Sequence, residues 1–356
     1  MPGQPLISIV IPVYNVQDDL PACLDSVLGQ SFGEMEVIAV ENGSTDRSGQ
    51  ILDDRAGQDT RLHVRHEPKT GPGQARNIGL ADAAGQYVWF IDADDLLPPG
   101  SLEAVAGRLR QAEPDALVVD FELLYHDGRT GPAPGGSALR AAPPGNFTIA
   151  QYPELLNHTM TVWSKIIRRG FLDANGISFP DGIHEDVPVS CAVLLGADRI
   201  SVLDRVCYRY RQARRGSFMT QSTSAHFDVF RSYRGVLDQA ARRQADGDPQ
   251  VTARLRAVLF ERAIWHYAAI LGTGGWGIGP AGASGLVPRG QRRRFFAMMN
   301  EDFGKYRPDG YRFPAGPRGV KLRLIERNAY RRYSLLEPAN RLRVVLLRRG
   351  VLSWGA

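Results

Sequence analysis

The first hundred residues alternate between short apolar runs and segments with a one-sided helical stripe. The apolar runs, which have the length and β-branched content of buried strands, occupy residues 6–13, 36–40, 62–66 and 87–91. The helical segments between them occupy residues 20–28, 48–56 and 74–84. This rhythm of strand and helix predicts a parallel, right-handed α/β sheet of the nucleotide-binding type.

The fourth apolar run leads directly into three carboxylates, Asp92, Asp94 and Asp95. Open α/β sheets bind their ligands at the carboxyl ends of the strands, where these acids would lie. In an extended chain, Asp92 and Asp94 would point to the same side, about 6.5–7 Å apart. Such oxygen ligands suit Mg²⁺ or Mn²⁺ shared with substrate phosphates. The alternative is an acidic turn before a helix that starts near Pro98 or Pro99.

The pattern becomes less regular after residue 100. The sequence predicts a helix over 101–111, a strand over 116–124, an exposed excursion over 127–146, and helix over 151–171 with an interruption at Trp163–Lys165. An acidic loop at 179–186 precedes an apolar helix over 187–195 and two short strands at 200–203 and 206–211. These segments extend the α/β region toward residue 220.

Composition changes near residue 220, which predicts two domains, 1–220 and 221–356. The second is expected to be mainly α-helical, with a Gly/Pro linker at 272–290. Its basic segments, Gln291–Phe296 and Arg341–Trp354, suit peripheral contact with an anionic membrane, or else form a solvated basic face or a dimer contact. No nucleic-acid-binding motif accompanies them, which disfavours that partner. A homo-oligomer is left open.

The composition of the 356 residues, 43% hydrophobic and 23% charged, is that of a soluble globular protein. No apolar stretch approaches the roughly 18 residues that cross a bilayer, and the amino terminus does not resemble a signal peptide. Cys23, Cys191 and Cys207 are expected to be buried thiols in a reducing compartment. We therefore expect a cytoplasmic protein, with the inner face of the cell membrane as the alternative location.

The first domain contains four motifs: PVYN at 12–15, VENGSTD at 40–46, GPGQARNIGL at 71–80 and IDADD at 91–95. Two more, HED at 184–186 and YRYR at 208–211, follow later. In this order and spacing they resemble the motifs of family 2 glycosyltransferases, over about residues 5–220. The resemblance implies the GT-A fold, a Rossmann-like mixed sheet flanked by helices, and similarity to bacterial cell-wall or teichoic-acid-type polymer glycosyltransferases.

The resemblance also assigns a binding site for a nucleotide-sugar donor. It implies that Pro12, Val13 and Tyr14 line the nucleobase pocket, with Tyr14 offering a ring for stacking. Glu41 and Asn42 stand where the family usually has aspartates that accept hydrogen bonds from the base, and both keep acceptor atoms. Asp46 either shares this role or caps the helix at Ser48, the alternative that the residues leave open.

The remaining assignments concern the basic and acidic residues that would act on the phosphates and the acceptor. Arg76 resembles the residue that braces the base-contacting acid, and Asn77 is expected to make structural hydrogen bonds. The resemblance implies that Asp92 contacts the ribose, with Ala93 in the same motif, that Asp94 binds the metal and the diphosphate, and that Asp95 supports this site. Arg209, Arg211 or Arg214 would neutralise the charge of the diphosphate. Asp186 would be the general base, with Glu185 as second choice.

The function implied by the resemblance is inverting, Mn²⁺- or Mg²⁺-dependent transfer of a sugar from a nucleotide-diphosphate donor, with UDP-sugars favoured. The acceptor would be a hydroxyl of a cell-envelope glycan, wall polymer or lipid-linked molecule. A catalytically idle nucleotide-sugar binding module that acts with a partner enzyme is the alternative, which the presence of Asp94 and Asp186 disfavours. A nucleotidyltransferase is disfavoured because PVYN lacks a Gly-rich phosphate loop with a basic residue.

Overall fold

The protein divides into two compact units, Met1–Arg211 and Gln212–Ala356, each of which we describe by itself. A computed structural model describes residues 4–132, 137–158, 160–212, 221–242, 249–272 and 285–336. The division falls at the end of the last strand of the sheet rather than near residue 220. Arg214, most of the linker at 272–290 and the segment Arg341–Trp354 lie outside the described residues.

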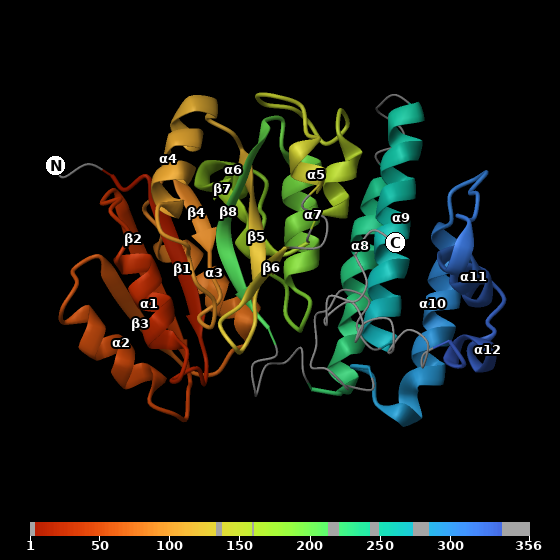
Figure 1. Ribbon diagram of the computed structural model, residues 1–356, viewed down its shortest axis with the longest axis horizontal. Coiled ribbons are helices and arrows are strands. Elements are labelled where there is room, and N and C mark those ends of the chain that lie inside the picture. The colour runs from red at the N-terminus through yellow and green to blue at the C-terminus, as the bar shows by residue number, and fades with distance from the viewer. Residues whose placement is uncertain are drawn as a thin grey trace. The chain divides into compact units, whose positions relative to one another are not determined.

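The amino-terminal unit is built on one mixed sheet (Figure 1). Its strands are β1 (Ile7–Val13), β2 (Met35–Asn42), β3 (Leu62–Glu67), β4 (Tyr87–Phe90), β5 (Ala116–Leu124), β6 (Thr130–Pro132), β7 (Lys165–Arg168) and β8 (Ile200–Arg211). Their order is β3-β2-β1-β4-β7-β5-β6, with β8 paired to β5. The first four strands are parallel, as the sequence predicts, whereas β7 runs antiparallel to both β4 and β5.

The helix expected over 151–171 is wrong. The structure has 3-10 turns at Pro153–Asn157 and Val162–Ser164, then β7, and then the short helix α6 (Arg169–Ala174). Ile166 and Ile167 are both fully buried, because β7 is an interior strand covered on both faces. Pairing with two neighbouring strands therefore overrides the helical pattern, as tertiary context often does for short segments.

The two strands expected between residues 200 and 211 form one continuous strand, β8. Its pairing with β5 shifts register near Asp120, which accounts for the break in the apolar pattern at Asp204 and Arg205. The excursion at 127–146 contains the short strand β6 and a helical turn, α5 (Ser137–Arg140).

Helices cover both faces of the sheet. They are α1 (Leu20–Leu28), α2 (Ser48–Ala56), α3 (Pro72–Asp82), α4 (Ser101–Ala112) and α7 (Asp186–Gly196). Leu24 of α1 and Val105 of α4 join one core cluster with the strand residues that point to that face, among them Ile9 and Trp89. Alternate strand residues point to the other face, where α3 approaches so closely that a side chain at Gly79 would collide with Val10.

The described part of the carboxy-terminal unit is helical. Its helices are α8 (Asp228–Arg242), α9 (Pro249–Leu271), α10 (Arg292–Tyr306), α11 (Gly316–Glu326) and α12 (Tyr330–Ser334). Aromatic side chains fill its core, and the rings of Phe230 and Tyr267 lie 4.4 Å apart, centroid to centroid. The mixed sheet and this helical region confirm the predicted fold class.

All three cysteines are buried, and none of them forms a disulfide bond. Among the described residues, no helix has the length and apolar character required to cross a membrane.

Candidate active site

The three aspartates that follow β4 lie in a tight turn rather than an extended strand. β4 ends at Phe90, and the backbone N–H of Asp95 donates to the carbonyl oxygen of Asp92 over 3.0 Å. The expectation that Asp92 and Asp94 share one side of a strand is therefore wrong, and the alternative of an acidic turn is correct in this respect. The turn gives each carboxylate different surroundings.

Asp95 supports the turn from inside. Its side chain is fully buried and accepts hydrogen bonds from the Tyr208 hydroxyl (2.6 Å) and the Arg211 backbone N–H (2.7 Å). The Tyr208 hydroxyl in turn accepts a hydrogen bond from the backbone N–H of Asp92 (3.2 Å). Burial, followed by repulsion from Asp94 and Asp92, raises the pKa of Asp95 well above its usual value.

Arg76, on α3, links the aspartate turn to a distant part of the chain. Its guanidinium is buried, donates to Asp92 over 2.7 Å, and makes a second, shorter ion pair with Glu185. The guanidinium also lies 5.5 Å from the ring centroid of Phe179. Burial alone would lower the pKa of Arg76, but Asp92 and Glu185 outweigh it and raise this pKa. The contacts place Arg76 against these two acids.

Several contacts hold the acidic loop before α7 against α3. Asn77 and Phe179 exchange two hydrogen bonds, with the Asn77 amide donating over 2.9 Å and accepting from the Phe179 N–H over 2.8 Å. Gln74 donates to Asp181 over 2.8 Å. A Cβ at Gly73 would lie 2.7 Å from the Pro180 carbonyl oxygen, so the helix and the loop are in direct contact. The structural role expected for Asn77 is thus observed.

Asp186 is the first residue of α7 and lies beside the Arg76 cluster. Burial, and next the charge of Glu185, raise its pKa to about 7, while Arg76 opposes the shift. Asp92 also raises this pKa, which places it in the same electrostatic environment as Asp186. A carboxyl group with a pKa near neutrality is suited to general acid–base chemistry.

The aspartate turn and Asp186 also share one neighbour, Tyr210. Burial raises its pKa, and Asp95, Asp94, Asp92 and Asp186 all contribute. The Tyr210 ring stacks on Trp163 at 5.4 Å between centroids. Both acidic groups are therefore close enough to Tyr210 to raise its pKa.

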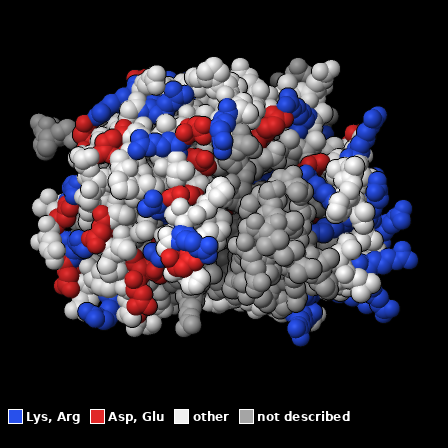
Figure 2. Space-filling model, in the orientation of Figure 1, with Lys and Arg blue, Asp and Glu red and all other residues white. Residues whose placement is uncertain are grey.

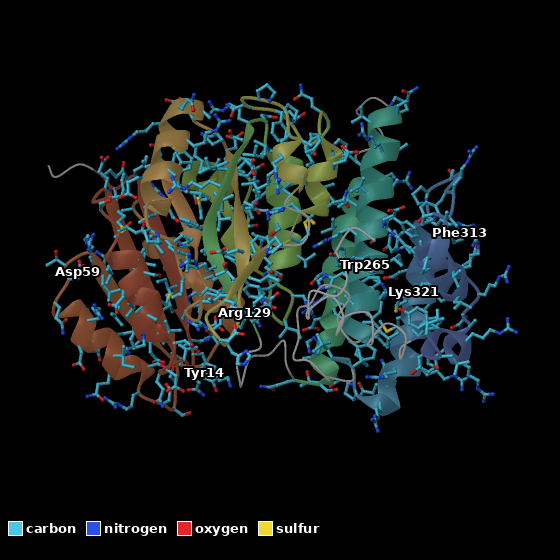
Figure 3. All side chains as sticks on the ribbon, viewed as in Figure 1. Tyr14, Asp59, Arg129, Trp265, Phe313 and Lys321 are labelled. Carbon is cyan, nitrogen blue, oxygen red and sulfur yellow. The ribbon has the colours of Figure 1, made fainter. Side chains whose placement is uncertain are left out.

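Tyr14, which the resemblance assigns to the nucleobase pocket, contacts Lys69. The Lys69 ammonium donates to the Tyr14 hydroxyl over 2.7 Å and lies 4.2 Å from the ring centroid. Figure 3 labels Tyr14, which directly follows β1. Asn42 holds the loop that carries Lys69, because its side-chain oxygen accepts from the Thr70 N–H over 2.7 Å. The loop after β3 thus closes onto the ends of β1 and β2.

Glu41 and Asp46 shape the loop after β2. Glu41 is buried, accepts from the Ser44 N–H over 2.5 Å, and lies 3.7 Å from His66. Asp46 accepts from the Gln17 N–H (3.1 Å) and the Ser48 N–H (2.9 Å). The contact of Asp46 with Ser48 lies at the start of α2, as the capping alternative predicts. The partners of Glu41 given above do not include Arg76, which pairs with Asp92 and Glu185 instead.

The remaining predicted site residues differ in how close they lie to the aspartate turn. Arg211 donates to the Asp94 carbonyl oxygen over 2.7 Å and pairs with Asp19 over 3.2 Å, so its guanidinium lies at the aspartate turn. Arg209 pairs instead with Glu122 over 2.7 Å. The side chains of Val13 and Ala93 are buried in the core cluster, so each could offer a ligand only its backbone. Pro12 lies next to Val13 and is half-buried.

Several residues at the site escaped the sequence analysis. Tyr208 stacks on Trp163 at 4.5 Å between centroids, with only 6° between the ring planes, and joins Asp92 to Asp95. Lys165 is fully buried and contributes to the electrostatics of Asp186. The alternation of YRYR could have indicated that its tyrosines share one face. No comparable signal marks Lys165.

The aspartate turn has few side chains that could hold a divalent cation. Within the described ranges, no three His, Cys, Asp or Glu side chains form a group that could hold a metal ion. Asp92 pairs with Arg76, and Asp95 accepts a hydrogen bond from Tyr208. The resemblance of the motifs assigns the cation to Asp94. Mg²⁺ commonly binds one or two carboxylates together with substrate phosphates. A cation at the turn would therefore need ligands from a bound substrate in addition to a carboxylate of the turn.

Comparisons with known proteins identify relatives. Residues 8–176 match the model of glycosyl transferase family 2. The uncharacterized glycosyltransferase EpsJ of Bacillus subtilis is 32% identical over 58% of this chain and 61% of EpsJ. The poly(ribitol-phosphate) beta-N-acetylglucosaminyltransferase TarS of Staphylococcus aureus is 28% identical over 63% of this chain and 38% of TarS. The chain thus spans less than two thirds of the length of either relative.

Two solved structures have a similar fold. The structure of S. aureus TarS in complex with UDP-GlcNAc has a TM-score of 0.71 at 23% identity, covering 94% of this chain and 91% of that chain. The mannosyltransferase PcManGT from Pyrobaculum calidifontis, in complex with GDP-Man and Mn²⁺, has a TM-score of 0.50 at 18% identity, covering 97% and 87%. At these identities the likeness concerns the fold alone. The family model thus matches residues 8–176 of the amino-terminal unit, and the two solved structures share the fold of this chain.

Proposed function

We propose that this chain is an inverting glycosyltransferase that moves a sugar from a nucleotide-diphosphate donor to a hydroxyl of a cell-envelope polymer. The observation that carries the proposal is the ion-paired Arg76, which joins Asp92 of the aspartate turn to Glu185, the neighbour of Asp186. The contact joins the aspartate turn, which includes Asp94, to the residue before Asp186. This arrangement supports the resemblance of the motifs.

In the proposed reaction, the acceptor hydroxyl attacks the anomeric carbon from the face opposite the diphosphate. A new carbon–oxygen bond forms, the bond to the phosphate oxygen breaks, and the diphosphate leaves with the electron pair. Asp186 takes the hydroxyl proton, for which its pKa of about 7 is suitable. Displacement from the opposite face inverts the anomeric configuration.

Charge develops on the departing diphosphate during this reaction. A divalent cation, Mn²⁺ or Mg²⁺, held by Asp94 would neutralise part of it when bound. Arg211 is the better candidate of the two described arginines to neutralise the remainder, since it lies at the Asp94 carbonyl while Arg209 pairs with Glu122. Manganese in the PcManGT complex is consistent with this role, at the level of the fold.

The nature of the donor and of the acceptor is proposed from the contacts of the site and from the relatives of this chain. Tyr14, Glu41 and Asn42 border the expected base pocket, and the UDP-GlcNAc complex of TarS supports a uridine nucleotide. The name of TarS supports a polyol-phosphate wall polymer as acceptor. We place the catalytic site in the amino-terminal domain and the reaction at the cytoplasmic side of the membrane, where such donors are available.

A thermal-shift panel of UDP-, GDP- and CDP-sugars, with Mn²⁺ or with EDTA, tests the proposal because a ligand that binds the folded state raises the melting temperature. We expect stabilisation by a UDP-sugar in Mn²⁺ and slow release of UDP from it without acceptor. Stabilisation without any release or transfer would favour the idle binding module instead. Absence of stabilisation by every nucleotide sugar would contradict both hypotheses.

A further inference from the structure

A histidine at the end of β3 lies between two carboxylates, one of which the resemblance assigns to the nucleobase. The Nε2 atom of His66 lies 2.8 Å from an Asp53 oxygen, and its Nδ1 atom lies 3.7 Å from a Glu41 oxygen. Asp53 belongs to α2 and Glu41 to β2. The imidazole of this cluster has no part in the reaction proposed above.

The pairing of the strands places His66 beside Glu41. The two residues are direct partners in the parallel register of β2 and β3, so their side chains emerge on the same face of the sheet. The first turn of α2 packs against both, because a Cβ at Gly49 would lie 3.6 Å from the Glu41 Cγ and 3.7 Å from the His66 Cε1. Strand register and helix packing thus hold the imidazole next to the carboxylate.

The two oxygens of the Glu41 carboxylate have different neighbours. Oε1 accepts a hydrogen bond from the Ser44 N–H over 2.5 Å, while Oε2 faces the Nδ1 atom of His66. The Glu41 side chain is 10% exposed and the His66 side chain 50%. The buried acid is therefore held by a backbone N–H on one side and faces a solvent-accessible imidazole on the other.

The protonation state of the imidazole decides how His66 acts on Glu41. Because Asp53 accepts at Nε2, the neutral ring keeps its proton there and turns the lone pair of Nδ1 toward Glu41. The protonated ring has a second N–H, at Nδ1, and its positive charge attracts the carboxylate. Only the cationic ring therefore holds Glu41 in place.

The surroundings of His66 favour its cationic form. The hydrogen bond with Asp53 is the largest cause of a raised pKa at His66; burial opposes it, and the charges of Asp53 and Glu41 add to it. Among the described residues, these are the two acids within ion-pair distance of the ring. Arg65, the preceding residue, pairs with Glu67 and Asp82 instead. Figure 2 shows acidic side chains interspersed with basic ones over α2 and β3.

We propose that cationic His66 positions Glu41 for recognition of the nucleobase, so that the protein binds its donor more tightly when His66 is protonated. Glu41 would accept the imide N–H of a uracil ring, and His66 would keep the carboxylate oriented toward that N–H. The inference rests on the proposed function, in which Glu41 borders the base pocket. His66 acts through Glu41 and is therefore a positioning residue, in a part of the sheet separate from Asp186.

Calorimetric titration of the whole chain with UDP-GlcNAc in Mg²⁺, from about pH 5.5 to about pH 8.5, tests this role, since histidine changes its charge in this range. His66→Gln keeps a donor for Asp53 but has no charge. Asp186 titrates in the same range, so the Kd of the variant is divided by that of the wild type at each pH. This ratio should be about three at the acidic end and should fall to about one at the alkaline end.

Two further variants separate this role from a merely structural one. Asp53→Asn removes the strongest interaction that favours the cationic ring, so the ratio, measured with and without His66→Gln in this background, should fall to one at a lower pH. His63→Gln, at an exposed position of β3, is the matched control and should equal the wild type at every pH. Melting temperatures establish that each variant is folded.

Three outcomes would overturn the proposal: a ratio that does not change with pH, the same loss in His63→Gln, or a transition that Asp53→Asn leaves in place. Tight binding of UDP-GlcNAc with a ratio of one throughout would refute the role of His66 and leave the proposed function intact. If the wild type bound no nucleotide sugar at any pH, the proposed function would be refuted, and the role of His66 with it.

Discussion

Arg76 and Glu185, which are 109 residues apart in the sequence, form a buried ion pair between α3 and the start of α7. The pair joins the GPGQARNIGL motif to the HED motif, and the second bond of Arg76, to Asp92, joins both to the aspartate turn. Three motifs that are separate in sequence therefore share one side chain.

Removal of the Arg76 charge should destabilise the protein. In Arg76→Met, Glu185 and Asp92 lose their shared partner, and loss of one member of a buried ion pair costs about 3 kcal/mol or more. Urea unfolding measures this loss. The control Arg65→Met, whose side chain is 53% exposed, should change the free energy of unfolding by about 0.5 kcal/mol or less. If adding Glu185→Gln to Arg76→Met restored no stability, the ion pair would not be the cause.

Turnover should depend on pH through Asp186. A general base must be deprotonated, so turnover should fall as the pH drops below about 7, the pKa of this carboxyl group. Asp186→Asn should lose about a thousandfold in turnover while donor affinity stays within about twofold. Initial rates across the pH range, together with calorimetric donor affinities, provide the measurement.

The same pH profile offers an internal control. Because Arg76 lowers the pKa of Asp186, Arg76→Met should move the acidic limb of the profile to higher pH. A limb that stayed in place would show that another group controls it.

Donor binding should depend on Asp94 only when a divalent cation is present. Asp94→Ala should weaken binding of the UDP-sugar in Mn²⁺ by about tenfold or more and abolish transfer, while affinities measured in EDTA should be equal for variant and wild type. Asp54→Ala, at an exposed position on α2, removes an equal charge as a control. Equal weakening in Mn²⁺ and EDTA would contradict the metal role.

Close contact at Gly73 should make this position intolerant of any side chain. In Gly73→Ala, the added methyl group would meet the Pro180 carbonyl oxygen at 2.7 Å, which should destabilise the protein by about 1–3 kcal/mol and displace the loop before Asp186. Thermal unfolding and turnover measure the two effects. The matched control is Gly107→Ala on α4, where nothing lies within 4 Å of the added atom. There the change should be neutral or stabilising by up to about 1 kcal/mol.

The alternating pattern of the first hundred residues predicted the parallel strands and their helices because each element has its own apolar periodicity. The same periodicity failed at 151–171, since Ile166 and Ile167 become a strand only through pairing with β4 and β5. Information of that kind comes from neighbours distant in sequence and is absent from a local window.

In the candidate site, too, local sequence patterns predicted some features, while contacts between distant residues could not be predicted. The motifs predicted a group of residues at the sheet edge; Asp92 there pairs with Arg76, the Asp94 carbonyl accepts from Arg211, and Arg76 and Asp92 both affect the pKa of Asp186. Partner choice was not predictable from spacing: Arg209 pairs with its cross-strand neighbour Glu122, while Arg211 reaches the aspartate turn. Tyr208 was missed because its importance depends on two hydrogen bonds across more than a hundred residues.

The hydrogen bond from the Arg211 N–H to Asp95 closes the aspartate turn with the last residue of the amino-terminal unit. Leu96 and Arg209 likewise exchange backbone hydrogen bonds of 3.2 and 2.8 Å. During synthesis, β1–β4 therefore leave the ribosome well before the strand that closes the aspartate turn. A nascent chain that stops short of β8 lacks these closing contacts, so under the proposed function nucleotide sugars should not bind it before translation has passed this strand.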